Sequence, residues 1–332
     1  MLRILGIETS CDETAAAVVE DGRFILSNVV ASSLKEHKKY GGIIPEIASR
    51  RQVELIHPVV KTALKEAQVS FDDLDAIAVT QSPGLIGSLL VGISYAKALS
   101  FATSKPLIKI DHIKAHLYAN FLSFASNGRP SSAQPKLPAV GMVVSGGHSS
   151  LYYLKNFANA QFRLLGKTRD DAAGEAFDKV ARILNLGYPG GPVIDRLSQK
   201  GKNNSIHFPP AQLAGSYDFS FSGVKTAVLY YTRRHQKEKE FSVEKIAYSF
   251  QNSVVTILTE KCIAACRRKK VKTLLVGGGV AANSELRSRL TQEAAKHHID
   301  VFYPPIALCL DNAAMIAGLA FQMSSSARSR FP

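Results

Sequence analysis

Two apolar segments, one in each half of the chain, run into polar turns and continue as second apolar segments. The first unit spans residues 2–19 with the polar turn 9–14, and the second spans residues 139–154 with the polar turn 145–150. Each unit predicts a β-hairpin that carries hydroxyl, carboxylate or imidazole groups at its tip. The recurrence favours a duplicated architecture, although the two halves share little residue-level similarity.

The segments between these units alternate between strand and helix patterns. Helical periodicity covers residues 47–66 and 84–101, and the apolar strand 76–80 separates them. This alternation favours the α/β class. Late in the chain, the apolar segment 273–276 leads into three glycines, and a helix follows from about Asn283. A strand, glycines and a helix in this order are typical of a nucleotide-binding turn, in which backbone amides approach a phosphate.

The length of 332 residues favours two packed domains. Residues 123–138 concentrate Ser, Asn, Gly, Gln and Pro and are the candidate linker between them. We therefore expect an N-terminal lobe over 1–122 and a C-terminal lobe over 139–306. The final helix, Asn312 to Met323, is apolar on nearly all sides, and we expect the C-terminal segment of about 307–323 to pack back and complete the N-terminal lobe. The tail from Ser324 is expected to fray.

The charge balance indicates anionic partners. The chain has 41 basic and 27 acidic side chains and a formal net charge of +14, which makes nucleic acid a candidate partner beside the alternative of an ordinary basic enzyme. Basic side chains also cluster: Lys35, Lys38 and Lys39; Arg50 and Arg51; Arg267, Arg268, Lys269, Lys270 and Lys272. Each cluster alone could be a solvated surface patch.

Cysteine usage and the N-terminus bear on the compartment. Four cysteines in a chain of this length do not form a disulfide scaffold, which fits a reducing cytoplasm. Acidic residues at Glu8, Asp12 and Glu13 argue against a signal peptide. No apolar run approaches membrane-spanning length, so we expect a soluble, cytoplasmic protein without a membrane partner.

The sharpest local signal for chemistry is a pair of histidines. His112 and His116 follow an apolar strand, with Asp111 as a plausible N-cap, and a spacing of four places both imidazoles on one helical face. Asp311, before the last helix, is the candidate third ligand. Taken alone, the histidines could be surface residues and Asp311 a helix cap. Two imidazoles and a carboxylate suit iron(II), zinc or manganese.

An acidic stripe points to a second site. Asp171, Glu175 and Asp178 fall at helical spacing just before the glycine- and proline-rich turn 187–192. A charged stripe is usually a solvated helix face. Glycines in such a turn, however, permit close approach of a ligand, so Asp178 and Asp195 are candidates to hydrogen-bond ribose hydroxyls.

Motifs along nearly the whole chain resemble one family. They are Gly6-Ile7-Glu8-Thr9-Ser10-Cys11-Asp12-Glu13-Thr14, Gly41-Gly42-Ile43-Ile44-Pro45-Glu46, Val144-Ser145-Gly146-Gly147-His148, residues 170–179, Ser220-Phe221-Ser222-Gly223 and Gly278-Gly279-Val280. In this order they closely resemble the TsaD family of bacterial tRNA N6-adenosine threonylcarbamoyltransferases, formerly labelled O-sialoglycoprotein endopeptidases. The resemblance implies the fold of actin, sugar kinases and Hsp70 (the ASKHA fold), with two ribonuclease-H-like lobes around a nucleotide and metal cleft.

The resemblance also implies site residues. The family's metal ligands fall on His112, His116 and Asp311, and iron(II) is the implied metal, with zinc as an alternative. Its substrate contacts fall on Val143, Val144, Ser145, Gly146, Gly147, Asp178, Gly191, Asp195 and Asn283. Archaeal and eukaryotic relatives have a tyrosine in the strand before the Ser-Gly-Gly turn; valines stand there in this chain, which favours the bacterial or organellar branch.

The implied activity is transfer of the threonylcarbamoyl group from threonylcarbamoyl-AMP to N6 of adenosine 37 in tRNAs that read ANN codons. Implied partners are tRNA, a TsaB-like paralogue, a TsaE-like ATPase and a TsaC-like synthase that supplies the adenylate. Asp12, Glu13 and His148 are the candidates for proton handling.

Three other functions are compatible with parts of the sequence. A zinc peptidase needs Glu directly after the first histidine, and Ile113 stands there, which argues against it. An ATP-hydrolysing kinase or chaperone would share the fold and the polar turns. A structural partner protein would tolerate loss of the metal.

Overall fold

The computed structural model describes residues 1–125, 134–157, 161–202, 206–210, 213 and 215–325. The chain forms two compact units. The N-terminal unit comprises Met1–Pro135, Asn156–Gln161 and Pro304–Pro332, and the C-terminal unit comprises Lys136–Lys155 and Phe162–Tyr303. The chain end thus returns to the N-terminal unit. Half of the candidate linker 123–138, residues 126–133, and most of the tail 324–332 lie outside the described residues.

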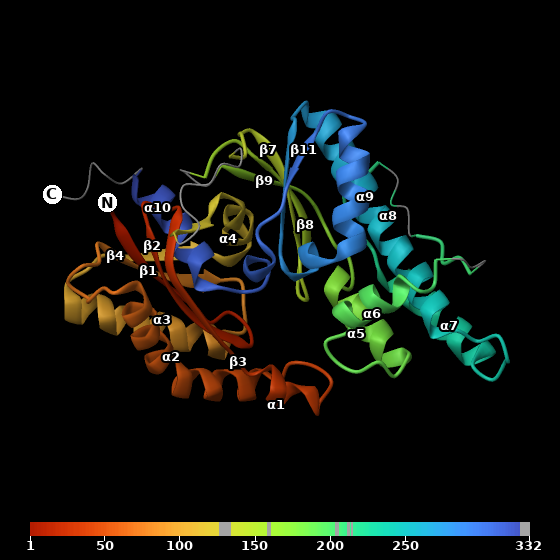
Figure 1. Ribbon diagram of the computed structural model, residues 1–332, viewed down its shortest axis with the longest axis horizontal. Helices are drawn as coiled ribbons and strands as arrows, with labels where there is room; N and C mark the ends of the chain where they lie inside the picture. The colour runs from red at the N-terminus through yellow and green to blue at the C-terminus, as the bar shows by residue number, and fades with distance from the viewer. Residues whose placement is uncertain (126–133, 158–160, 203–205, 211–212, 214, 326–332) are drawn as a thin grey trace. The chain divides into compact units, whose positions relative to one another are not determined.

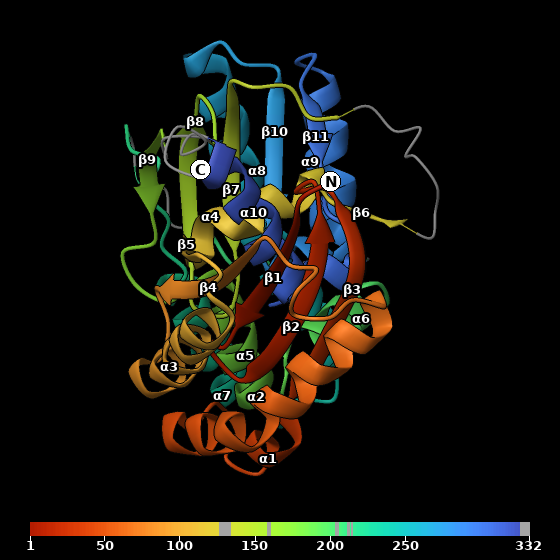
Figure 2. The same cartoon turned by 90° about the vertical axis from the view of Figure 1, so that its left-hand side faces the viewer.

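The N-terminal unit is built on a six-stranded sheet of order β5-β4-β1-β2-β3-β6. Its strands are β1 (Arg3–Glu8), β2 (Glu13–Glu20), β3 (Phe24–Ser32), β4 (Ala76–Ser82), β5 (Leu107–Asp111) and β6 (Ser123–Phe124). The first three strands pair antiparallel, and β4, β5 and β6 pair parallel with their neighbours, as Figure 2 shows. The predicted hairpin at the N-terminus is confirmed.

Helices cover both faces of this sheet (Figure 1). On one face, α2 (Pro45–Ala67) and α3 (Ile86–Thr103) pack on alternate strand residues such as Leu5 and Ile7. On the other face lies α10 (Ala313–Ser325), which approaches so closely that a Cβ at Gly6 would lie 2.3 Å from the carbonyl oxygen of Ala313. Gly6 is therefore required by packing, and this contact seats the C-terminal helix against β1.

The C-terminal unit repeats this plan. Its five-stranded sheet has the order β11-β10-β7-β8-β9, and the strands are β7 (Ala139–Val144), β8 (Ser149–Leu154), β9 (Phe162–Lys167), β10 (Thr273–Gly277) and β11 (Asp300–Phe302). Strands β7, β8 and β9 form an antiparallel meander, and β10 and β11 join in parallel. The order matches β5-β4-β1-β2-β3 of the other sheet, so the predicted duplication is confirmed.

Within the described residues, the C-terminal unit has five α-helices: α5 (Ala173–Ile183), α6 (Gly191–Ser198), α7 (Ser222–His235), α8 (Val243–Lys269) and α9 (Ser284–Ala295). Helix α8 is the central one, with Phe250, Val254 and Leu258 fully buried. Shorter elements are α1 (Leu34–Lys38), α4 (His112–Tyr118), η1 (Ala119–Phe121), η4 (Gly279–Ala282) and η5 (Ile306–Leu308).

One helix of the described chain, α3, is long and apolar enough to cross a membrane by length and composition. Its residues Ser88, Gly92 and Ala96 are nevertheless buried within the N-terminal unit. The side chain of Thr9, next to β1, donates a hydrogen bond to the carbonyl of Ser88 at 2.9 Å. Helix α3 is thus a surface helix of a folded unit, with a polar tie to the sheet.

Candidate metal centre and adenylate cradle

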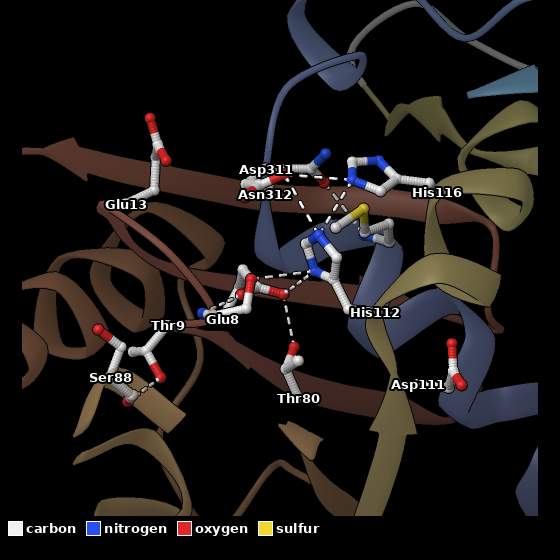
Figure 3. Close-up of polar contacts among 12 residues, drawn as sticks. Glu8, Thr9, Glu13, Thr80, Ser88, Asp111, His112, His116, Asp311 and Asn312 are labelled. Atoms are coloured by element: carbon white, nitrogen blue, oxygen red, sulfur yellow. Dashed lines mark hydrogen bonds and ion pairs between the residues drawn. The ribbon is translucent and has the colours of Figure 1, made fainter. Parts of the chain in front are cut away.

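Helix α4 presents the two predicted histidines side by side. Asp111 ends β5 and caps the helix, because its Oδ1 accepts a hydrogen bond from the Lys114 amide at 3.0 Å, as the sequence predicted. The one-turn spacing then brings Nε2 of His112 within 3.2 Å of Nε2 of His116 (Figure 3). Both side chains are buried, with 5% and 1% of their surface exposed. The surface-histidine alternative is therefore wrong.

Asp311 joins the pair from the segment before α10. Its Oδ1 lies 3.1 Å from Nε2 of His116 and 3.5 Å from Nε2 of His112 (Figure 3). The helix cap is supplied by Asn312, whose Oδ1 accepts a hydrogen bond from the Met315 amide. Asp311 is therefore not needed as a cap, and its carboxylate faces the histidines.

The three side chains suit a divalent cation. One nitrogen or oxygen atom from each of His112, His116 and Asp311 can be chosen so that all lie within 4.8 Å of one another. Two imidazoles and one carboxylate form a donor set for iron(II), zinc or manganese, and three protein ligands leave coordination positions for a substrate. The residues present fit the metal that the sequence motifs imply.

Electrostatics link the three groups. Burial disfavours the charged form of Asp311, but His112 and His116 outweigh that effect and hold the pKa of Asp311 below its usual range. Burial likewise opposes charging of His112, yet the carboxylates of Asp311 and Glu8 raise its pKa well above the ordinary value. Burial lowers the pKa of His116. These shifts favour the charged form of His112 beside Asp311 when no metal is bound, and a cation that binds through Nε2 must displace the proton from that nitrogen.

The polar turn between β1 and β2 carries two of the predicted acid–base candidates. Asp12 is buried and Glu13 lies beside it. Burial, with the negative charges of Asp12 and Asp311, raises the pKa of Glu13 to about 9. Glu13 can therefore hold a proton at neutral pH. The amide of Gln52, from α2, fixes the turn by donating to the carbonyls of Cys11 and Glu13 at 2.9 and 3.0 Å.

In the C-terminal unit, five of the predicted substrate contacts lie at the end of β7 and in the turn that follows it. Val143 and Val144 end the strand, and the turn is closed by hydrogen bonds in both directions between Ser145 and His148. A Cβ at Gly146 or Gly147 would meet nothing within 4 Å. These glycines are thus not demanded by packing within the fold, and they leave backbone amides accessible to a ligand.

Asp178 lies on α5 beside a second glycine turn. Its Oδ1 accepts a hydrogen bond from the Gly190 amide at 2.7 Å, and the Gly191 amide also bonds to it. Burial raises the pKa of Asp178 even though these amides favour the ionised form. A Cβ at Gly191 would meet nothing within 4 Å. The turn is therefore held by Asp178 and open on its outer side.

Asp195 and Asn283 are brought together by Gln251, a residue that sequence reasoning missed. The amide of Gln251 donates to Oδ1 of Asp195 at 3.1 Å, and its oxygen accepts from the Asn283 amide at 2.8 Å. Asn283 also caps α9 through the Leu286 amide. Asp195 accepts further bonds from the amide and hydroxyl of Ser284. The sequence did hold a signal for Gln251: it is a long polar side chain on the buried face of α8.

Of the three residues of the acidic stripe, Glu175 and Asp178 lie on α5 and Asp171 does not. Asp171 precedes α5 and forms ion pairs with Lys179 and Lys225, each at 2.6 Å, so the expectation that it lies on the helix is wrong. Asp170 accepts hydrogen bonds from the hydroxyls of Ser220 and Ser222. The motifs at 170–179 and 220–223 therefore fasten the start of α7 to the start of α5.

Sequence reasoning also missed the support behind the metal centre. Glu8, at the end of β1, is fully buried and contacts His112 and Thr80 (Figure 3). A carboxylate that interrupts an otherwise apolar strand was the signal that could have found it.

The fold and the site together define a class. Two sheets with the same strand order, a glycine-lined turn on one and a His-His-Asp cluster on the other, make this an ASKHA-fold protein with a candidate metal centre. Full-length HypF, with phosphate and nucleotide bound, shares the fold (TM-score 0.60, 12% identity, covering 99% of this chain and 47% of HypF). So does component A of (R)-2-hydroxyglutaryl-CoA dehydratase from Acidaminococcus fermentans (TM-score 0.54, 15% identity, covering 98% of this chain and 100% of that one).

The chain belongs to the TsaD family, the tRNA N6-adenosine threonylcarbamoyltransferases, whose profile it matches over residues 24–318. A tRNA N6-adenosine threonylcarbamoyltransferase of Clostridium botulinum (strain Hall) is 51% identical over 322 residues, which cover 96% of this chain and 92% of the relative. The enzyme of the same name from Caldicellulosiruptor bescii is 50% identical over 321 residues, with the same coverage. The family resemblance drawn from the motifs is confirmed.

Proposed function

We propose that this chain transfers the threonylcarbamoyl group of threonylcarbamoyl-AMP to N6 of adenosine 37 in tRNAs that read ANN codons. His112, His116 and Asp311 hold a divalent cation, iron(II) in this proposal and zinc as the alternative. Val143, Val144, Ser145, Gly146, Gly147, Asp178, Gly191, Asp195 and Asn283 bind the adenylate. The observation that carries the proposal is the family match over residues 24–318 together with the clustering of His112, His116 and Asp311.

In this transfer, the protein must position the two substrates and stabilise the charge that develops during the reaction. The carbonyl of a mixed anhydride is already reactive, whereas the exocyclic amine of adenosine is a weak nucleophile. A bound divalent cation would supply Lewis-acid polarisation of the carbamoyl group. The amides of Gly146 and Gly147 are placed in this proposal near the AMP phosphate, where they stabilise the leaving group.

Proton handling falls to Asp12, Glu13 or His148 in this proposal. The amine of adenosine loses a proton as the new bond forms, so a group that can accept it is needed. Asp12 lies next to Glu13, whose raised pKa keeps Glu13 protonated near neutral pH. This supports Asp12 as acceptor, with Glu13 as its neutral neighbour.

Partners complete the proposal: tRNA, a TsaB-like paralogue, a TsaE-like ATPase and a TsaC-like synthase. The surface that supports a paralogue is the outer face of α2 and α3, where Val53, Ile86, Leu90 and Phe101 are all exposed. Ile86, Leu90 and Phe101 recur at helical spacing on one side of α3. A large exposed apolar face of this kind is typical of an interaction surface. Leu90→Glu should abolish binding of the paralogue and leave the metal content unchanged.

The test of the proposal is direct transfer. The protein is incubated with threonylcarbamoyl-AMP, unmodified tRNA that reads ANN codons, and the TsaB-like and TsaE-like partners, and nucleosides are analysed by mass spectrometry. Threonylcarbamoyladenosine that requires this chain supports the proposal. ATP hydrolysis by this chain alone, with no modified nucleoside from the complete mixture, would overturn it in favour of the kinase or chaperone alternative.

A further inference from the structure

We propose that Glu8 is a positioning residue of the metal centre: its carboxylate fixes His112 as the tautomer that is protonated on Nδ1, so that Nε2 is presented to the cation. This inference rests on the metal site of the proposed function. Glu8 is neither a metal ligand nor a substrate contact in this inference, and it acts only through His112.

The geometry assigns the two nitrogens of His112 to different tasks. Nδ1 lies 2.9 Å from Oε2 of Glu8, and Nε2 lies on the side of His116 and Asp311, at 3.2 and 3.5 Å (Figure 3). A histidine that ligates through one nitrogen needs a hydrogen-bond acceptor at the other, because the acceptor selects the tautomer and fixes the ring plane. Glu8 is placed to be that acceptor.

The surroundings of Glu8 require an acceptor and not a donor. The Ser10 amide donates to its Oε1 at 2.5 Å, and the Thr80 hydroxyl donates to its Oε2 at 2.5 Å. With His112 this makes three donors around one carboxylate. A carboxamide at this position would turn an NH₂ group toward at least one of these donors. The site therefore matches the charge of Glu8 as well as its length.

The placement of Glu8 is held from independent strands. Glu8 ends β1, Thr80 lies on the parallel neighbour β4, and His112 begins α4 directly after β5. Glu8 is 0% exposed. The carboxylate is thus buried at the ends of adjacent strands, and a buried charge of this kind persists only where partners compensate it. A cation held by His112, His116 and Asp311 would be flanked by two carboxylates, which balances its charge.

Among the described residues, His116, unlike His112, has no carboxylate that orients its ring through Nδ1. Nδ1 of His116 is buried, and no hydrogen-bond partner for it is found within the described part of the chain. His112 is therefore the oriented ligand of the pair and His116 the unsupported one. Loss of the carboxylate should weaken the centre through His112 without removing any ligand.

The test is metal binding by the full chain, stripped with a chelator and titrated with cobalt(II) against a chelating indicator. Glu8→Gln should bind cobalt about 10–100-fold more weakly than wild type. Its visible cobalt absorption bands should shift, because the plane of His112 is no longer fixed. Thr80→Val, which keeps the carboxylate but removes one of its donors, should weaken binding by a smaller factor. The matched control is Glu20→Gln, at the far end of the same hairpin, where the carboxylate pairs with Arg3.

The outcomes separate this inference from the proposed function. If wild type binds no cobalt, or binds it with no dependence on His112 and His116, the metal site itself fails. If wild type binds cobalt through the histidines but Glu8→Gln shows the same affinity and the same spectrum, the positioning role of Glu8 is overturned. Lower thermal stability of Glu8→Gln with unchanged cobalt affinity would likewise reduce Glu8 to a structural residue. Should Glu8→Gln fail to fold, unchanged affinity and spectrum in Thr80→Val would overturn the role.

Discussion

The candidate metal centre of the N-terminal unit and the candidate adenylate cradle of the C-terminal unit, which is the turn 145–148 with Asp178, Gly191, Asp195 and Asn283, are built in opposite ways. The candidate metal centre consists of two buried histidines on α4 and a partly buried aspartate before α10, and Glu8 directs the ring of His112. The cradle consists largely of backbone, with Gly146 and Gly147 exposed. Substitution of a single side chain should therefore destroy the first site and only weaken the second.

The largest effect is expected at the histidines. His112→Ala or His116→Ala should abolish both stoichiometric metal binding and transfer, because each removes one of three protein ligands. Metal content by mass spectrometry and nucleoside analysis should fall together, while adenylate affinity falls less than in Asp178→Ala. His297→Ala, in the turn that follows α9, is the matched control. A histidine variant with full transfer and no metal would break the comparison.

A smaller effect is expected in the cradle. Asp178→Ala removes the acceptor that holds the amides of Gly190 and Gly191, and loss of a hydrogen bond to a charged group typically costs about 1.5–3 kcal/mol. Calorimetry should show weaker adenylate binding with tRNA affinity near wild type. Glu293→Ala, on the surface of α9, serves as the control. Equal losses for both ligands would mean that Asp178 supports the fold alone.

The metal centre should also respond to pH. The pKa of His112 is raised in the metal-free protein, so the cation displaces a proton, and affinity should increase as pH rises toward that pKa. The expected slope is about tenfold per pH unit while His112 is protonated, measured by competition with a chelator of known pH dependence. Adenylate binding should lack this slope. A flat metal affinity between pH 6 and pH 8 would show that His112 carries no proton to displace.

The smallest single effects are expected on the basic surface. Each neutralised phosphate releases counterions, so tRNA affinity should fall steeply with salt. Arg267→Glu with Arg268→Glu, at the end of α8, should lower tRNA affinity and reduce the salt slope by about one per lost contact. Arg50 and Arg51 already pair with Glu46 and Glu54, so reversal there should cost less. Affinity that is independent of salt would assign the RNA surface to a partner.

The sequence predicted elements better than it predicted partners of side chains. The hairpins, α2 and α3 followed from periodicity to within two residues, and the one-turn spacing of His112 and His116 fixed their common face. The sequence could not place Glu8 or Gln251, because their contacts are made across residues far apart in the chain. The prediction placed Asp171 on the helix because its spacing to Glu175 is helical. In the structure α5 begins two residues later, and the carboxylate of Asp171 pairs with Lys225 of α7.

The central claim is that transfer depends on the His-His-Asp centre. Its most direct test measures threonylcarbamoyladenosine formed by one preparation of the wild-type protein, with its partners, before removal of metal, after removal, and after addition of iron(II). The account predicts loss of product on removal and recovery on addition, with no recovery in His116→Ala. Undiminished product from the metal-free protein would contradict it.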